Sequence, residues 1–114
     1  MNPRCFGIEP RTDGSIVIAA QDDGEVDVRR FEAARTQVPA VIDFVRERSH
    51  SPRVCIAALG AGALALALAF VELPEAEVIL LRPAALPSAC QAAVKPVNDS
   101  STALALARYA RRAA

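Results

Sequence analysis

The chain offers few side chains that could do chemistry, and the carboxylate of Glu9 is the first of them. Glu9 follows a short apolar run at residues 5–8 and precedes a turn cluster at residues 10–14. A carboxylate at a strand end can hold a divalent cation, but hydrolysis by two metal ions requires several carboxylates that converge on ions about 4 Å apart. Glu9 therefore predicts either one member of such a site or an exposed strand end.

Two further motifs carry weak signals. His50, the only histidine, lies between two serines near an expected helix end, where a solvated imidazole is the ordinary arrangement. No Ser-His-Asp or Cys-His arrangement can be built around it. Gly60 and Gly62 follow an expected strand and open a helix, as in a phosphate-binding loop, but the third glycine and the Lys-Ser/Thr pair of such loops are missing. Close packing of a strand against a helix explains these glycines equally well.

Three arginines near the end of the last expected helix, Arg108, Arg111 and Arg112, share one face because their spacing is i, i+3, i+4. They could contact nucleic-acid phosphates. A structural role is favoured, because the helix dipole attracts cations there and arginine is abundant throughout the chain. Thirteen basic and thirteen acidic side chains cancel, which excludes a domain that holds nucleic acid by overall charge. Any such contact must be local.

Length and composition predict one folded domain. The chain has 114 residues, 53% of them hydrophobic and 23% charged, which is too apolar for a disordered tail and enough for one core. Cys5, Cys55 and Cys90 form an odd set without CxxC spacing, which favours a reducing cytoplasm and no structural zinc. Residues 54–71 carry no charge, but their alanines and two glycines favour a strand and a buried helix over a membrane span.

The hydrophobic pattern predicts alternating strands and helices. Strands are expected at residues 5–8, 15–20, 26–31, 54–59 and 78–81, and helices at about 36–49, 63–73, 84–94 and 101–112. The Ala-Leu alternation in 63–73 also fits a strand, and helix is chosen because alanine and leucine are strong helix formers. The order β-β-β-α-β-α-β-α predicts an α/β fold, in which a three-stranded antiparallel meander is continued by parallel strands with crossover helices. This is the order of the ribonuclease H-like fold.

The C-terminal part of the chain carries a family signature. Residues 97–110 read Val-Asn-Asp-Ser-Ser-Thr-Ala-Leu-Ala-Leu-Ala-Arg-Tyr-Ala. This segment resembles the Lys-x-Asp-x-x-Asp-Ala-x-x-Leu-Ala-x-Tyr-Ala signature of insertion-sequence transposases with a RuvC-like DEDD domain. Residues 6–9 are similar to the family's Gly-Ile-Asp first strand, and residues 23–26 to its Asp-Gly-Glu-Val turn. The resemblance is collinear and covers nearly the whole chain.

The departures from the family fall on its chemistry. The resemblance implies four acids that bind catalytic Mg²⁺, at positions that are Glu9, Ala57, Asp99 and Thr102 here. Only Asp99 is unchanged, while Ala57 cannot bind a metal ion and Thr102 offers a neutral hydroxyl. Glu9 and Asp99 are thus the expected vestigial catalytic and metal-binding residues. The family also has a downstream serine-bearing recombinase domain, which we expect to be missing from the single domain at residues 1–114.

The resulting prediction is a transposase-related, non-catalytic module of the cytoplasm, with no cofactor and no membrane contact. It would act in nucleic-acid binding, dimerisation or the regulation of DNA recombination, with weak contact to DNA or RNA through Arg108, Arg111 and Arg112. One alternative is a Mg²⁺-dependent nuclease or transposase subunit that uses Glu9 and Asp99, completed by a partner chain. The other is a purely structural homodimer unrelated to mobile elements.

Overall fold

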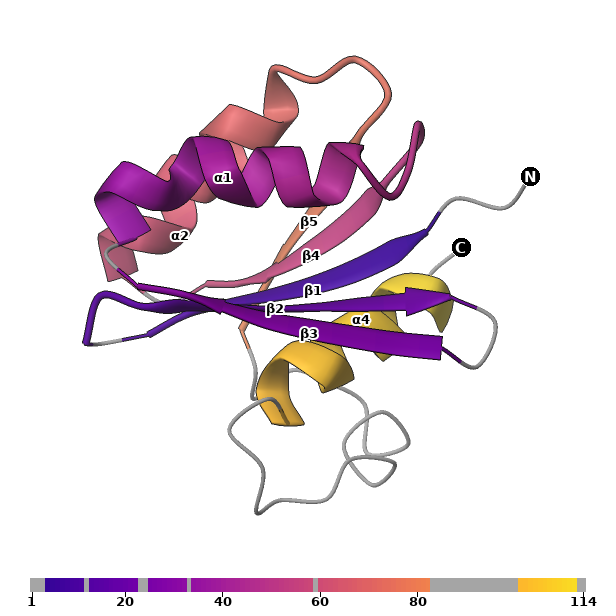
Figure 1. Ribbon diagram of the computed structural model, residues 1–114, viewed down its shortest axis with the longest axis horizontal. Helices are drawn as coiled ribbons and strands as arrows, with labels where there is room; N and C mark the ends of the chain where they lie inside the picture. The colour runs from indigo at the N-terminus through magenta and orange to yellow at the C-terminus, as the bar shows by residue number, and fades with distance from the viewer. Residues whose placement is uncertain are drawn as a thin grey trace.

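A five-stranded mixed sheet forms the centre of the molecule, with helices on both of its faces (Figure 1). The computed structural model describes residues 4–11, 13–22, 25–32, 34–58, 60–82 and 101–112. The described elements are, in chain order, β1 (Cys5–Pro10), β2 (Ile16–Asp22), β3 (Glu25–Phe31), α1 (Ala34–Arg46), β4 (Arg53–Ala57), α2 (Gly60–Val71), β5 (Glu77–Leu81) and α4 (Ser101–Arg112).

The strand order in the sheet is β3-β2-β1-β4-β5. Neighbouring strands among β1, β2 and β3 are antiparallel, whereas β4 pairs in parallel with both β1 and β5. The prediction of an α/β fold with a mixed sheet is confirmed. The first turn is formed by Asp13, whose carboxylate accepts hydrogen bonds from the Ser15 amide at 2.9 Å and the Ser15 hydroxyl at 2.6 Å. Gly14 completes this turn at a φ of 89°, a conformation that favours glycine.

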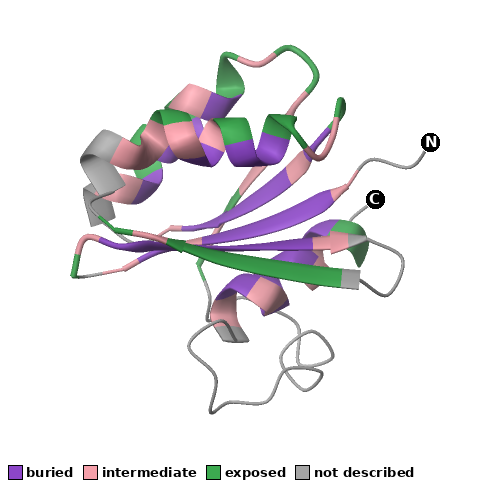
Figure 2. Ribbon diagram, viewed as in Figure 1, coloured by how far each residue is buried: buried purple, intermediate pink, exposed green. Residues whose placement is uncertain are grey.

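Helices α1 and α2 cover one face of the sheet and close the larger core (Figure 1). Apolar residues of β1, β2 and β4 that point to this face are buried, as Figure 2 shows for the central strands. They pack against the buried helix residues Val41, Phe44, Val45, Leu66 and Phe70. Burial of this many large side chains is the main source of stability in a domain of this size.

Helix α4 covers the opposite face and lies unusually close to β1. A Cβ added at Gly7 would collide with the backbone oxygen of Ala103 and the backbone nitrogen of Ala107, and would lie 2.8 Å from the Leu106 Cβ. Only glycine allows a helix backbone to approach a strand this closely. The residues that α4 turns toward the sheet are mostly alanines, and Ala103, Ala107 and Ala110 are fully buried.

Several expected boundaries shift in the structure. The helix expected at 36–49 spans Ala34–Arg46, and the one expected at 63–73 spans Gly60–Val71. The two glycines therefore lie inside the first turn of α2, where the backbone amides need no partner within the helix and glycine is tolerated. The helix expected at 84–94 lies outside the described residues.

Two expectations from the sequence, on the membrane span and on the cysteines, are tested in part by the structure. Among the described residues, no helix has the length and apolar character that a membrane crossing requires. Residues 54–71 form most of β4 and all of α2 instead of one long helix. Cys5 and Cys55 are buried, and Cys90 lies outside the described residues.

Candidate functional site

The carboxyl ends of β1 and β4 bring Glu9 and Ala57 next to each other. Ile8 pairs with Ile56 in the parallel register, and Glu9 and Ala57 are the next residues of their strands. Side chains alternate along a strand, so Glu9 is on the same face as Gly7, the face that α4 covers. Ala57 packs on that face in a cluster with Cys55 and residues of α4. The two positions therefore share one end and one face of the sheet.

Thr102 belongs to the same end of the sheet because of the direction of α4. The carbonyl of Ala110, in the last turn of α4, accepts a hydrogen bond from Arg53 at the start of β4. Because α4 thus ends over the beginning of β4, it begins near the carboxyl ends of β1 and β4 (Figure 1). Thr102 is a half-buried residue of its first turn. Asp99 lies outside the described residues.

The carboxylate of Glu9 is held by a neighbouring cation. Glu9 Oε1 accepts from Arg11 Nε at 3.1 Å and lies 3.0 Å from Arg11 Nη2. The Glu9 side chain is only 14% exposed, and that of Arg11 24% exposed. A shielded ion pair of this kind is broken only at the cost of leaving a carboxylate partly buried without its partner. A metal ion at Glu9 would have to displace Arg11.

Ala57, beside Glu9, offers no ligand to a cation. Its side chain is fully buried among apolar residues, and a methyl group has no electron pair to offer a cation. Within the described part of the chain, no group of three or more His, Cys, Asp or Glu side chains could hold a metal ion. One ion-paired carboxylate, one methyl group and one hydroxyl do not fit the two Mg²⁺ ions that the family resemblance implies.

The C-terminal arginines lie at the other end of α4. Arg108 is half-buried, and Arg111 and Arg112 are exposed in the last turn. Nine residues separate Thr102 from Arg111, which corresponds to about 14 Å along a helix. The structure therefore does not bring these arginines together with Glu9. The last turn of α4, which carries Arg111 and Arg112, lies near the amino end of β4.

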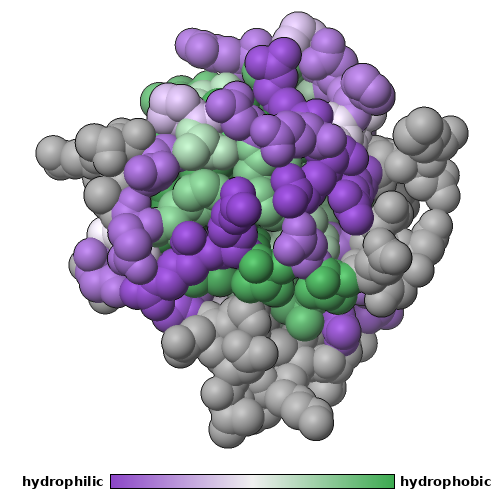
Figure 3. All heavy atoms as spheres, viewed as in Figure 1, coloured by the Kyte–Doolittle hydropathy of each residue, from purple (hydrophilic) through white to green (hydrophobic). Residues whose placement is uncertain are grey.

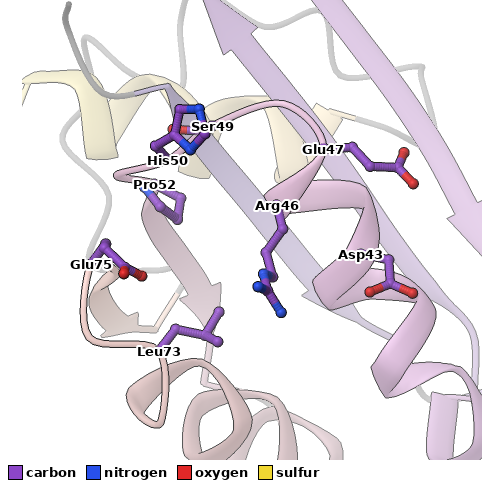
Figure 4. A pocket seen from close by; sticks show the side chains of 8 residues that line it. All are labelled: Asp43, Arg46, Glu47, Ser49, His50, Pro52, Leu73 and Glu75. Carbon is purple, nitrogen blue, oxygen red and sulfur yellow. The ribbon is translucent and has the colours of Figure 1, made fainter.

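A cavity of about 450 Å³ also lies at that amino end, between the end of α1, the residues before β4 and the turn after α2 (Figure 4). It is lined by Asp43, Arg46, Glu47, Ser49, His50, Pro52, Leu73 and Glu75. In Figure 4, His50 and Ser49 lie together at one side, while Asp43 and Glu47 lie away from them. These side chains do not form a catalytic triad. His50 is exposed, as expected for a solvated residue at a helix end.

The sequence analysis did not identify two arginines that join elements of the fold. Arg53 donates to Glu77 at 2.8 Å and to the Ala110 carbonyl at 3.2 Å, so it joins β4, β5 and the end of α4. The hydrogen bond to Glu77 raises the pKa of Arg53. A signal was present in the sequence, because Arg53 and Glu77 begin adjacent parallel strands and pair in the sheet.

The second arginine, Arg48, joins the end of α1 to β3. Its Cζ lies 3.6 Å from the centre of the Phe44 ring, and its Nε and Nη2 donate to Asp27 at 3.1 and 3.0 Å. Arg29 of β3 approaches the same ring, at 5.5 Å. This cation–π cluster fixes the helix on the sheet and needs no ligand to explain it.

Comparisons with known proteins leave the family of this chain unassigned. A scan against models of known protein families found no match. A search of curated proteins found no significant relative. Function must therefore be inferred from the residues of the chain and their geometry.

Proposed function

We propose that this chain is a non-catalytic ribonuclease H-like module, related to the N-terminal RuvC-like domains of insertion-sequence transposases. It acts in nucleic-acid binding or in the regulation of DNA recombination. The sheet order β3-β2-β1-β4-β5, with its antiparallel half and its parallel half, supports the proposed fold. The proposal is also supported by Glu9 and Ala57, which end adjacent parallel strands as the first and second acidic positions of the family would.

The observation that carries the non-catalytic part is the buried methyl group of Ala57 beside an ion-paired Glu9. Two Mg²⁺ ions bring four positive charges, and strand cleavage relies on several carboxylates to hold and orient them. At this sheet end Arg11 already neutralises the one carboxylate that the described residues supply. The chain would therefore retain the fold of the family without its metal-dependent catalysis.

The nucleic-acid part is supported by the exposed residues Arg111 and Arg112. They lie in the last turn of α4, where cations are also favoured by the helix dipole. Since the chain has no net charge, contact with phosphates has to be confined to such a local group. Binding should accordingly be weak and sensitive to salt.

A nuclease assay tests the non-catalytic part. Supercoiled and branched DNA incubated with the protein and Mg²⁺ or Mn²⁺ should stay intact. Cleavage that disappears in Asp99→Ala would overturn the proposal, because it would show that a working metal site is assembled around Asp99.

Fluorescence anisotropy with labelled DNA, over a salt series, tests the binding part. The double variant Arg111→Ala/Arg112→Ala should bind more weakly, and its plot of log affinity against log salt should be less steep by about 2. The matched control is Arg46→Ala/Arg82→Ala, which removes two exposed arginines elsewhere and should retain the wild-type slope. Equal loss in both double variants, or no binding at low salt, would contradict a local nucleic-acid surface.

A further inference from the structure

Helix α2 leaves one apolar face uncovered. It has no charged or polar side chain between Gly60 and Val71, a composition typical of helices that are buried on all sides. Its inner face, which includes Leu66 and Phe70, is buried in the core. Its outer face exposes Leu64 by 58%, Leu68 by 60% and Val71 by 64%. The spacing i, i+4, i+7 aligns these three side chains in one stripe along the helix.

Strand β5 continues this apolar surface at the edge of the sheet. Leu80 is 49% exposed and pairs with Ile56, whose side chain belongs to the core under α2, so Leu80 lies on the same face of the sheet as α2. The Glu77 amide donates to the Pro52 carbonyl, and the Leu81 carbonyl accepts from the Ala58 amide. Glu77 and Leu81 therefore direct their backbone groups toward the β4 side of the strand.

The alternation of a parallel strand then directs the backbone groups of Val78 and Leu80 outward. Among the described strands, none pairs with this side of β5. We call the surface formed by Leu64, Leu68, Val71, Leu80 and the outer edge of β5 the α2–β5 surface.

The two edge strands, β3 and β5, differ in the charged side chains that oppose pairing with another strand. Strand β3 exposes Val26 and Val28 but places the charged residues Asp27, Arg29 and Arg30 beside them, and Figure 3 shows both hydrophilic and hydrophobic side chains on that side of the molecule. Charged side chains on an edge strand are a common device against pairing with another strand. In β5 the only charged residue is Glu77, at its start. The edge that is open to pairing is therefore the one beside the apolar stripe.

We propose that the α2–β5 surface binds the same surface of a second copy of this chain. The two β5 strands would pair antiparallel across a two-fold axis, and the α2 stripes would pack against each other on one face of the joined sheet. This inference goes beyond the proposed function, because it holds whether or not the chain binds nucleic acid.

The backbone pattern of β5 favours a second copy as the occupant. Glu77, at the start of the strand, is paired with Arg53 of its own chain. Val78 and Leu80 direct their backbone groups outward, and a two-fold axis at Ile79 places Val78 of each copy opposite Leu80 of the other, with both side chains on the face of α2. The stripe on α2 carries no charge, so two copies meet there without repulsion. A nucleic acid would find no cation on this stripe.

Mass measurement by light scattering or sedimentation, over a concentration series without nucleic acid, tests the inference. The wild type should have twice the 12.1 kDa mass of the chain. Leu68→Glu should raise the dissociation constant at least about 100-fold, because each substitution counts twice in a two-fold interface. Val28→Glu is the matched control: Val28 is 41% exposed on the β3 edge, and this variant should remain dimeric. Circular dichroism should be unchanged in both, since both side chains are exposed.

Hydrogen exchange supplies an independent readout. The amides of Val78 and Leu80 should become more protected as protein concentration rises.

A monomeric wild type would overturn the inference, whether residues of the same chain or another molecule covers the stripe. So would a dimer that forms only with DNA, one that persists in Leu68→Glu, or one that dissociates in Val28→Glu. Nucleic-acid binding by a monomeric wild type would leave the proposed function standing and remove only this inference.

Discussion

Replacing Gly7 by alanine tests the closest contact in the fold. The added Cβ would meet two backbone atoms of α4, at Ala103 and Ala107, and would lie 2.8 Å from the Leu106 Cβ, where ordinary contact begins near 3.4 Å. Backbone atoms cannot rotate away as the end of a side chain can. The helix must therefore move away from the sheet, or β1 must bend.

The cost of Gly7→Ala can be bounded from what α4 buries. Overpacking of a core ordinarily costs about 1 to 3 kcal/mol. Complete loss of the docked helix would expose Leu106 and four alanine methyl groups, which amounts to about 5 kcal/mol. We expect a loss of about 3 kcal/mol, because the helix has to move as a unit but can retain part of its contact.

Urea unfolding and hydrogen exchange measure this effect. The urea midpoint should fall by about 1 to 2 M, and the amides of Ser101–Arg112 should lose protection before the rest of the chain. Two glycine variants serve as controls. Gly62→Ala, whose Cβ would lie 3.6 Å from Pro10, should keep or raise the midpoint, because alanine is the better helix former. Gly14→Ala has open space but a φ of +89°, so it should cost only about 1 kcal/mol and leave α4 protected. A Gly7→Ala protein with the wild-type midpoint and a protected α4 would refute the described packing of α4 on β1.

Three more substitutions or titrations probe the contacts of Arg53 and Asp13 and the buried position of Ala57. Arg53→Ala should lower the free energy of unfolding by about 1 to 2 kcal/mol, since it removes a charged donor from the Ala110 carbonyl, and Arg53→Lys should restore part of this in urea unfolding. Hydrogen bonds from Ser15 hold the pKa of Asp13 below its ordinary 3.8, so its stabilising contribution is present above pH 3.8 and is lost as pH falls through the lower, folded value. An NMR titration should show this pKa return toward 3.8 in Ser15→Ala. Ala57→Asp should destabilise the fold by about 3 kcal/mol at neutral pH, because it buries a carboxylate, and acidification should recover part of the loss. Added Mg²⁺ should not raise the melting temperature of this variant, and a Mg²⁺-dependent rise would contradict the absence of a usable site.

The sheet could be predicted from the sequence because its central strands are buried on both faces. Runs such as 54–57 are continuously apolar, and the Asp-Gly turns mark where the meander reverses. The bounds of α2 were harder to predict, because its composition is apolar on all sides and gives no amphipathic stripe to mark where it begins.

The site was only partly predictable. The meeting of Glu9 and Ala57 depends on β1 and β4 being neighbours, which a crossover connection favours but does not specify. The pairing of Glu9 with Arg11 had a local signal, because residues two apart in an extended chain point to the same side. The close approach at Gly7 also had one, since glycine inside a strand often marks a neighbouring backbone. That the neighbour is α4 depends on the whole sheet.

The pairing of Glu9 with Arg11 also bears on how the chain folds. Carboxylates gathered in one place repel each other, so a domain that carries several of them folds against that repulsion unless cations are bound. Among the described residues at this sheet end, Arg11 supplies the opposite charge to Glu9 from the same chain, and Ala57 contributes a methyl group to the cluster under α4. Helix α4 therefore docks through its alanines onto described residues whose one carboxylate is already paired. A methyl group at position 57 allows the helix to pack there by apolar contact alone.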